Sequence, residues 1–174
     1  FEGRVVDFKT APAWDISFRS DRVTLGELPV LAGLLPPRMS LSGPAGFRLA
    51  TKGTKDAFEL TSVVDMKPTA ITFGTFFDKP ANSPLTLSSR MVKRPEIMEI
   101  TTLDLDLGTI KARGSGEIKK IGDASRFQIH MDTNKVALQT AQTTIPMLRS
   151  FRPSGDVTLR TVLGGGGGGP LSIS

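Results

Sequence analysis

The sequence predicts an all-β fold, mainly of long antiparallel strands, with two short helices. Apolar and polar residues alternate with a period of two along most of the 174 residues, and several alternating stretches run for about ten residues. In addition, two segments about 112 residues apart carry the same order of motifs. Strict alternation gives each strand one apolar and one polar face, the pattern of an antiparallel sheet with one solvated side.

The repeated order is strand, short strand, short helix, turn and strand. The first copy begins at 14–18 and reaches its turn at Ser42-Gly43, and the second begins at 127–131 and reaches its turn at Ser154-Gly155. Folds that grow by adding units produce such repeats. We therefore expect residues 1–174 to be a fragment of one elongated β-rich domain. Repeat unit 1 would cover about 14–126, and the start of repeat unit 2 about 127–174. Chance similarity between two β-rich stretches is the alternative.

The expected elements follow from this alternation and from the breaks in it. Strands are expected at 3–9, 14–25, 45–52, 57–66, 69–77, 84–93, 96–107, 109–119, 125–138, 154–163 and 170–174. Leucines at helical spacing before Pro36-Pro37 predict a short helix over about 27–36, and a second is expected over about 140–151. Each helix would cap one end or edge of the sheet.

Three local features add detail to the predicted strands. The apolar phase changes near Thr101-Thr102, where a β-bulge would restore one apolar face. Gly114 and Gly116 interrupt a strand and predict bending or a close backbone approach. The six glycines from Gly164 to Gly169 predict a flexible loop.

Composition excludes several classes of protein. The 22 Lys and Arg residues, against 17 Asp and Glu, give a net charge of +5, but they are scattered, and the chain has no Tyr and one Trp. Nucleic-acid binding proteins cluster such charge with aromatic residues, so we expect no nucleic-acid partner. Without Cys there is no disulfide or Cys-rich metal site. No apolar run reaches the roughly 18 residues of a membrane span, and no signal peptide is visible.

Nothing in the sequence predicts an enzyme, a cofactor or a metal site. His130, the only histidine, alternates with apolar neighbours and should face water. Asp104 and Asp106 share one face of a strand. Paired carboxylates can perform acid–base chemistry or bind a cation, but a charged face opposite Lys and Arg of adjacent strands explains them better. The glycine-rich segments lack the Lys-Ser/Thr that follows a phosphate-binding loop.

The inward-facing apolar residues form a candidate lipid-binding stripe. They are Leu60, Val64, Phe73, Leu87, Met91, Leu105, Ile129 and Met131. A one-sided apolar sheet either packs on a second sheet, giving a closed sandwich, or curves into a groove that receives a ligand. A lipid chain of about 16 carbons needs on the order of 12 kcal/mol of apolar lining, which only a continuous stripe over several strands can supply.

Several of these segments together resemble a known family. They are the Leu-rich stretch from Glu27 to Pro36, the Ser42-Gly43 strand, the hairpin between Phe77 and Leu85, and Leu105-Asp106-Leu107-Gly108 leading to Ala112-Arg113-Gly114. Over nearly its whole length the chain is similar to the periplasmic part of the AsmA-like proteins of Gram-negative bacteria. These are TamB-related, bridge-like lipid-transfer proteins.

The resemblance implies a periplasmic module anchored to the inner membrane through a segment absent from this chain. Its β-groove would bind or conduct phospholipid between the inner and outer membranes and so support outer-membrane biogenesis. The implied partners are phospholipid acyl chains and envelope proteins, and membrane contact would come through other parts of the protein. The alternative is a closed β-sandwich that serves as a structural or assembly module of the cell envelope without lipid transport.

Overall fold

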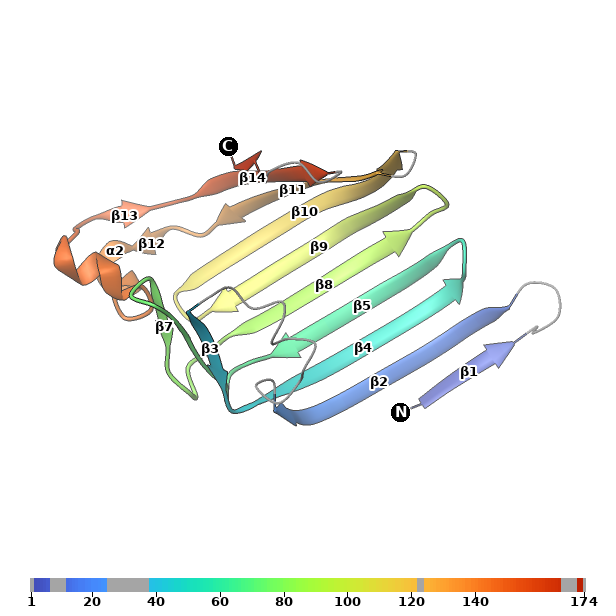
Figure 1. The fold of residues 1–174 in the computed structure, drawn as a ribbon, viewed down its shortest axis with the longest axis horizontal. Helices are drawn as coiled ribbons and strands as arrows, with labels where there is room; N and C mark the ends of the chain where they lie inside the picture. The colour runs from blue at the N-terminus through green and yellow to red at the C-terminus, as the bar shows by residue number, and fades with distance from the viewer. Residues whose placement is uncertain (1, 7–11, 25–37, 122–123, 167–171, 174) are drawn as a thin grey trace.

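In the computed structural model, the chain forms one large antiparallel sheet with small elements gathered at one end (Figure 1). The structure describes residues 2–6, 12–24, 38–121, 124–166 and 172–173. Within them the main sheet has ten strands in the order β1-β2-β4-β5-β8-β9-β10-β11-β14-β15, and each neighbouring pair is antiparallel. These strands are β1 (Glu2–Val6), β2 (Ala13–Thr24), β4 (Pro44–Thr54), β5 (Phe58–Asp65), β8 (Thr86–Lys93), β9 (Ile97–Leu107), β10 (Ile110–Ile121), β11 (Ala124–Thr133), β14 (Arg160–Gly166) and β15 (Ser172–Ile173).

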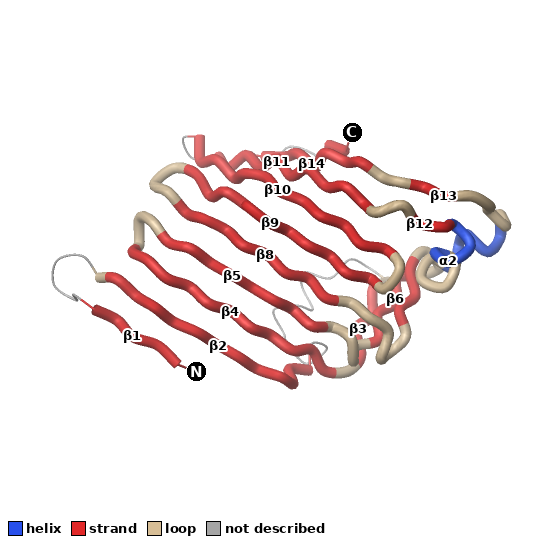
Figure 2. The backbone as a smooth tube through the Cα atoms, turned by 180° about the vertical axis from the view of Figure 1, so that it is seen from behind, coloured by secondary structure: helices blue, strands red, loops and turns tan. Residues whose placement is uncertain are grey.

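The small elements, here termed the cap, belong to three long connections that leave the main sheet at the same end (Figures 1 and 2). The connections join β2 to β4, β5 to β8, and β11 to β14. Their elements are β3 (Met39–Ser42), β6 (Ala70–Phe73), β7 (Phe77–Lys79), β12 (Val136–Ala137), the α-helix α2 (Leu138–Ala141), the 3-10 helix η2 (Pro146–Ser150) and β13 (Asp156–Val157). A three-stranded sheet forms in the order β3-β6-β7, and β12 pairs with β13. The opposite, hairpin end carries the short turns of β4–β5 and β8–β9.

Most of the fully buried apolar side chains lie in the cap or where the main sheet meets it. Ala45, Ile71, Leu85, Val136 and Ala141 are each at most 6% exposed. The other two among the described residues are Ala112, near the cap end of β10, and Ile100, in the middle of β9. The hydrophobic core is therefore concentrated at one end, while most of the main sheet is a single layer.

Lys79, in β7, is the largest buried polar side chain of the described residues, with 1% exposure. Its Nζ donates to the backbone oxygens of Thr69 (2.5 Å), Lys67 (3.2 Å) and Pro80 (3.2 Å). Burial lowers the pKa of Lys79, and the carboxylate of Asp65 opposes part of that shift. The ammonium group thus ties together the two strands and the turn that build this side of the cap.

The all-β, mainly antiparallel prediction is confirmed, and the helical predictions are confirmed only in part. The helix expected over 140–151 is interrupted: α2 has four residues, and a 3-10 helix begins at Pro146, because proline has no N–H with which to continue an α-helix. The helix expected over 27–36 lies outside the described residues. The strand expected over 69–77 is wrong as one element, since a turn at Gly74 (φ 53°) divides it into β6 and β7.

The expectation of a loop at the glycine run is wrong for its first half. Gly164, Gly165 and Gly166 extend β14 and pair with residues 126–128 of β11. Backbone hydrogen bonds between strands need no side chain, so glycine composition alone did not reveal this pairing. The rest of the run, 167–169, lies outside the described residues.

Candidate functional site

Four cross-strand rows of side chains, here termed the apolar face, cover one side of the main sheet. The strand register defines these rows as Trp14, Gly53, Phe58, Lys93, Met98, Ile118 and Phe127; Ile16, Thr51, Leu60, Met91, Ile100, Gly116, Ile129 and Leu163; Phe18, Leu49, Ser62, Ser89, Leu103, Gly114, Met131 and Thr161; and Ser20, Phe47, Val64, Leu87, Leu105, Ala112 and Thr133. Residues directly opposite one another across an antiparallel pair point to the same side. Twenty of these thirty positions are apolar, and the others are Gly, Ser, Thr and Lys93. In the third row the hydroxyls of Ser62 and Ser89 lie 2.8 Å apart and form a hydrogen bond.

The structure brings together seven of the eight residues of the predicted stripe. Leu60, Val64, Leu87, Met91, Leu105, Ile129 and Met131 all lie on the apolar face. Phe73 does not, because it belongs to β6 of the cap, where its ring stacks at an angle on Phe76 with centroids 6.0 Å apart. Alternation places a residue on one side of a strand but does not say which sheet the strand joins.

The predicted β-bulge is present in β9. Met91 pairs with Ile100, while Arg90 pairs with Thr102, so Thr101 is the extra residue. The hydroxyl of Thr101 donates to the backbone oxygen of Arg90 at 3.0 Å. Because two residues occupy the place of one, Ile100 and Leu103 both point to the apolar face. Ile100, at 4% exposure, is one of its few fully buried members.

Glycines let neighbouring strands approach closely on this face. A Cβ atom at Gly116 would lie 2.2 Å from the backbone oxygen of Gln128, and one at Gly114 would lie 2.6 Å from that of His130. Real Cβ atoms do not come this close to backbone atoms, so both positions require glycine, as the sequence suggested. In the first row, Gly53 separates Trp14 from Phe58, whose rings meet with centroids 6.0 Å apart.

The described residues leave the middle and the hairpin end of the apolar face without a second layer. Neighbouring strands of the main sheet and the elements of the cap account for the described contacts between elements, and Figure 2 shows the strands side by side as one layer. Phe18 and Leu49 are 43% and 39% exposed, and most other apolar members are half-buried by their neighbours within the sheet. Among the described residues the arrangement is thus an open sheet, not a closed sandwich.

Charged side chains occupy the opposite side of the sheet, where they pair across strands. Arg113 Nε lies 2.9 Å from Asp104 Oδ1, and Lys111 Nζ lies 3.2 Å from Asp106 Oδ2. The hydrogen bond and the charge of Asp104 raise the pKa of Arg113. The prediction of a charged face opposite Lys and Arg is confirmed, and His130 is exposed on this side as expected.

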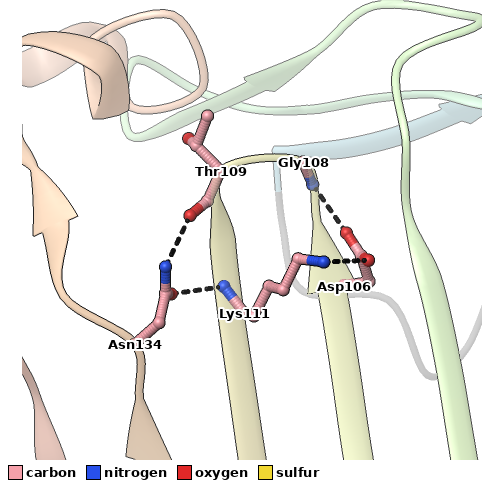
Figure 3. Close-up of polar contacts among 5 residues, drawn as sticks. All are labelled: Asp106, Gly108, Thr109, Lys111 and Asn134. Atoms are coloured by element: carbon pink, nitrogen blue, oxygen red, sulfur yellow. Dashed lines mark hydrogen bonds and ion pairs between the residues drawn. The ribbon is translucent and has the colours of Figure 1, made fainter.

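Asn134 connects this charged side to the turn between β9 and β10 (Figure 3). Its Oδ1 accepts from the Lys111 N–H at 2.7 Å, and its Nδ2 donates to the Thr109 oxygen at 3.0 Å. On the other side of the turn, Asp106 accepts from the N–H of Gly108, which has a φ of 66°. These bonds fix the cap end of β9, β10 and β11, from which the apolar face begins.

The described residues hold no cluster of three or more His, Cys, Asp or Glu side chains that could ligate a metal ion. In the same part of the chain, no helix has the length and apolar character needed to cross a membrane. Comparisons with known proteins found no matching family model, no matching curated protein and no matching solved structure. The apolar face is therefore the feature from which function can be argued.

Proposed function

We propose that this chain is an AsmA-like periplasmic module whose apolar face binds phospholipid acyl chains. The module conducts phospholipid between the inner and outer membranes and so supports outer-membrane biogenesis, within a protein anchored to the inner membrane. It performs no enzymatic reaction. The resemblance given above supplies the cellular setting, and the open apolar face supports lipid binding.

The size of the apolar face is the observation that carries the proposal. Neighbouring strands lie about 4.8 Å apart, and residues two apart in a strand about 6.8 Å. Over the eight strands from β2 to β14, the four rows measure about 34 Å by about 20 Å, a footprint of about 700 Å². Twenty of the thirty positions are apolar, so the apolar part of the footprint is about 450 Å². This lies within the range of about 300–600 Å² for the largest apolar patch of a typical soluble monomer, which is often a binding site. An acyl chain that covers such a patch gains about 0.8 kcal/mol per methylene buried.

The kinds of side chain on this face suit a variable apolar ligand. Met91, Met98 and Met131 provide flexible, polarisable surface that adapts to different chain positions. Lys93, at the hairpin end of the same face, is the only basic residue in the four rows. Acyl chains would therefore meet a nearly uncharged path between the cap and the hairpin end.

The arrangement of the connections supports the repeat-built architecture that the sequence suggested, and a curved groove is part of the same proposal. Both copies of the repeat begin with a long strand, β2 or β11, and both leave the main sheet at the cap end before returning as β4 or β14. A protein extended by further units of this kind would continue the apolar face from one unit to the next.

Native mass spectrometry of the gently purified 174-residue chain tests the proposal. We expect phospholipid to co-purify in a defined ratio, and a fluorescent phospholipid to bind again after delipidation. A chain with its charged side altered, Asp104→Asn, serves as the matched control and should bind equally. Protein that carries no phospholipid and does not take it up would refute lipid binding and favour an envelope assembly module.

A further inference from the structure

Away from the apolar face, the cap exposes three large apolar side chains around one cavity. Phe76 is 55% exposed, Met147 38% and Phe151 72%. All three line a cavity of about 700 Å³ between the β6–β7 turn and η2. We term these three residues, with Arg149 and Arg152 beside them, the aromatic patch. Side chains of this size seldom remain so exposed in a group unless they meet a partner.

The protein holds the two sides of the aromatic patch together by backbone contacts. The N–H of Asp78, after the β6–β7 turn, donates to the oxygen of Thr144, before η2, at 3.0 Å. The N–H of Phe76 donates to Phe73, and that of Phe151 to Leu148. Phe76 and Phe151 therefore stand on two tight turns that are fixed relative to each other, and their exposure is a built feature of the cap.

Within the part of the chain that the structure describes, the aromatic patch carries two arginines without ion pairs, like Arg48 and Arg126 of the main sheet. Residues 138–155 include Arg149 and Arg152 and no acidic residue. Neither arginine forms an ion pair among the described residues, whereas Arg113, Arg160 and Lys111 of the main sheet each pair with an aspartate. Arg149 and Asp78 both line the cavity and offset each other. Arg152, next to Phe151 in the chain, gives the patch its net charge of +1. Arg149 Nε donates to the backbone oxygen of Gln142 at 3.1 Å. Its other guanidinium donors and those of Arg152 have no carboxylate partner among the described residues and remain available for phosphate groups.

We propose that the aromatic patch docks the cap on the surface of an anionic lipid bilayer. Phe76 and Phe151 would enter the interface between head groups and acyl chains, and Arg149 and Arg152 would contact lipid phosphates. Exposed aromatic side chains next to cationic ones are typical of membrane-surface binding, since the apolar and electrostatic attractions add. A protein partner is less well matched, because the apolar groups project from two turns around an open cavity. This inference rests on the proposed function, in that docking would bring the cap end of the apolar face to a source of lipid.

Flotation with vesicles tests the docking. Vesicles of phosphatidylcholine alone are compared with vesicles that also contain phosphatidylglycerol, and we expect binding chiefly to the second. The double variant Phe76→Ser/Phe151→Ser should weaken binding by about tenfold for each phenylalanine. The double variant Arg149→Gln/Arg152→Gln should weaken it by about fivefold for each arginine and remove the preference for phosphatidylglycerol. All four side chains are exposed, so both variants should keep a cooperative thermal transition. The melting temperature should fall only slightly, because Phe76 loses its ring contact with Phe73 and Arg149 its hydrogen bond to the oxygen of Gln142.

Two matched controls separate the aromatic patch from general surface effects. Val157→Ser/Leu159→Ser removes apolar groups that are 42% and 57% exposed but do not line the cavity. Lys55→Gln/Arg126→Gln removes two exposed positive charges at the hairpin end. Both controls should bind vesicles nearly as well as the wild type. The docking proposal is overturned if the wild type binds neither kind of vesicle, or if the controls weaken binding as much as the patch variants. Phospholipid that still co-purifies in either case would leave the proposed function standing.

Discussion

Replacing Leu105 by aspartate places a carboxylate in the row of the apolar face that lies nearest the cap. Leu105 lies opposite Leu87 of β8 and Ala112 of β10, and Asp104 and Asp106 on either side of it point the other way. The new charge would stand among apolar side chains of three strands. The substitution therefore tests both the assignment of the face and the way in which the face is used.

The expected cost to folding is moderate because Leu105 is only half-buried. Full burial of a leucine stabilises a fold by about 1.5–3 kcal/mol, so a half-buried one loses about 1–2 kcal/mol. A carboxylate on an open face keeps access to water, which holds the total cost to about 1–3 kcal/mol of a typical 5–15. Leu85→Asp is the matched control, since Leu85 is 6% exposed at the cap. An unpaired charge there should cost about 5 kcal/mol or more and unfold the chain.

Thermal unfolding and titration with a fluorescent phospholipid measure the two effects. We expect Leu105→Asp, and likewise Leu87→Asp, to lower the melting temperature while leaving a cooperative transition. Both variants should weaken phospholipid binding by about tenfold or more, because an acyl chain would have to desolvate the carboxylate. Unfolding of Leu105→Asp to the same degree as Leu85→Asp would mean that the face is a closed core. A folded variant with unchanged lipid binding would contradict the assignment of the face.

Three further outcomes follow from single positions. Gly116→Ala should destabilise the fold by about 1–3 kcal/mol in chemical denaturation, because its Cβ would meet backbone atoms of β11, whereas Gly46→Ala, with its nearest neighbour at 3.7 Å, should be nearly neutral. The pKa of Lys79 is lowered in the folded protein and is about 10.4 in the unfolded chain. Between these two values the free energy of unfolding should rise with pH, because the unfolded chain binds more protons in that range. Lys79→Met should lack this part of the rise when the wild type and the variant are denatured at a series of pH values across the range. Asp104→Asn and His130→Ala should each change stability by less than about 1 kcal/mol and leave phospholipid binding intact, and a loss of binding in either would reveal a site on the charged side.

Alternation along the sequence predicted the faces of the main sheet, since a period of two is a local property of each strand. It placed seven residues of the stripe correctly and located the bulge at Thr101, because the apolar phase could not continue without one. Alternation could not identify the cap. Met39–Ser42 is too short to show a period. The strand predicted over 69–77 contains the turn at Gly74, and the Gly74-Thr75 pair was the sequence signal that could have indicated this turn. Phe73 was misplaced for the same reason.

The buried core of the described residues and the proposed lipid-binding face occupy different parts of this molecule. The residues that exclude water almost completely, such as Ile71 and Leu85, lie in or next to the cap, where three long connections meet. Over the rest of the main sheet, ladder hydrogen bonds and paired charges such as Arg113 with Asp104 hold the strands, and these need no second layer. The apolar face is thus free of the requirement to serve as the core. Different apolar molecules can then contact its half-buried side chains one after another. The side chains of a fully packed interior cannot change their contacts in this way without loss of stability. A surface that conducts lipid must allow this exchange of contacts, and that is the physical reason to propose lipid transport for the open sheet.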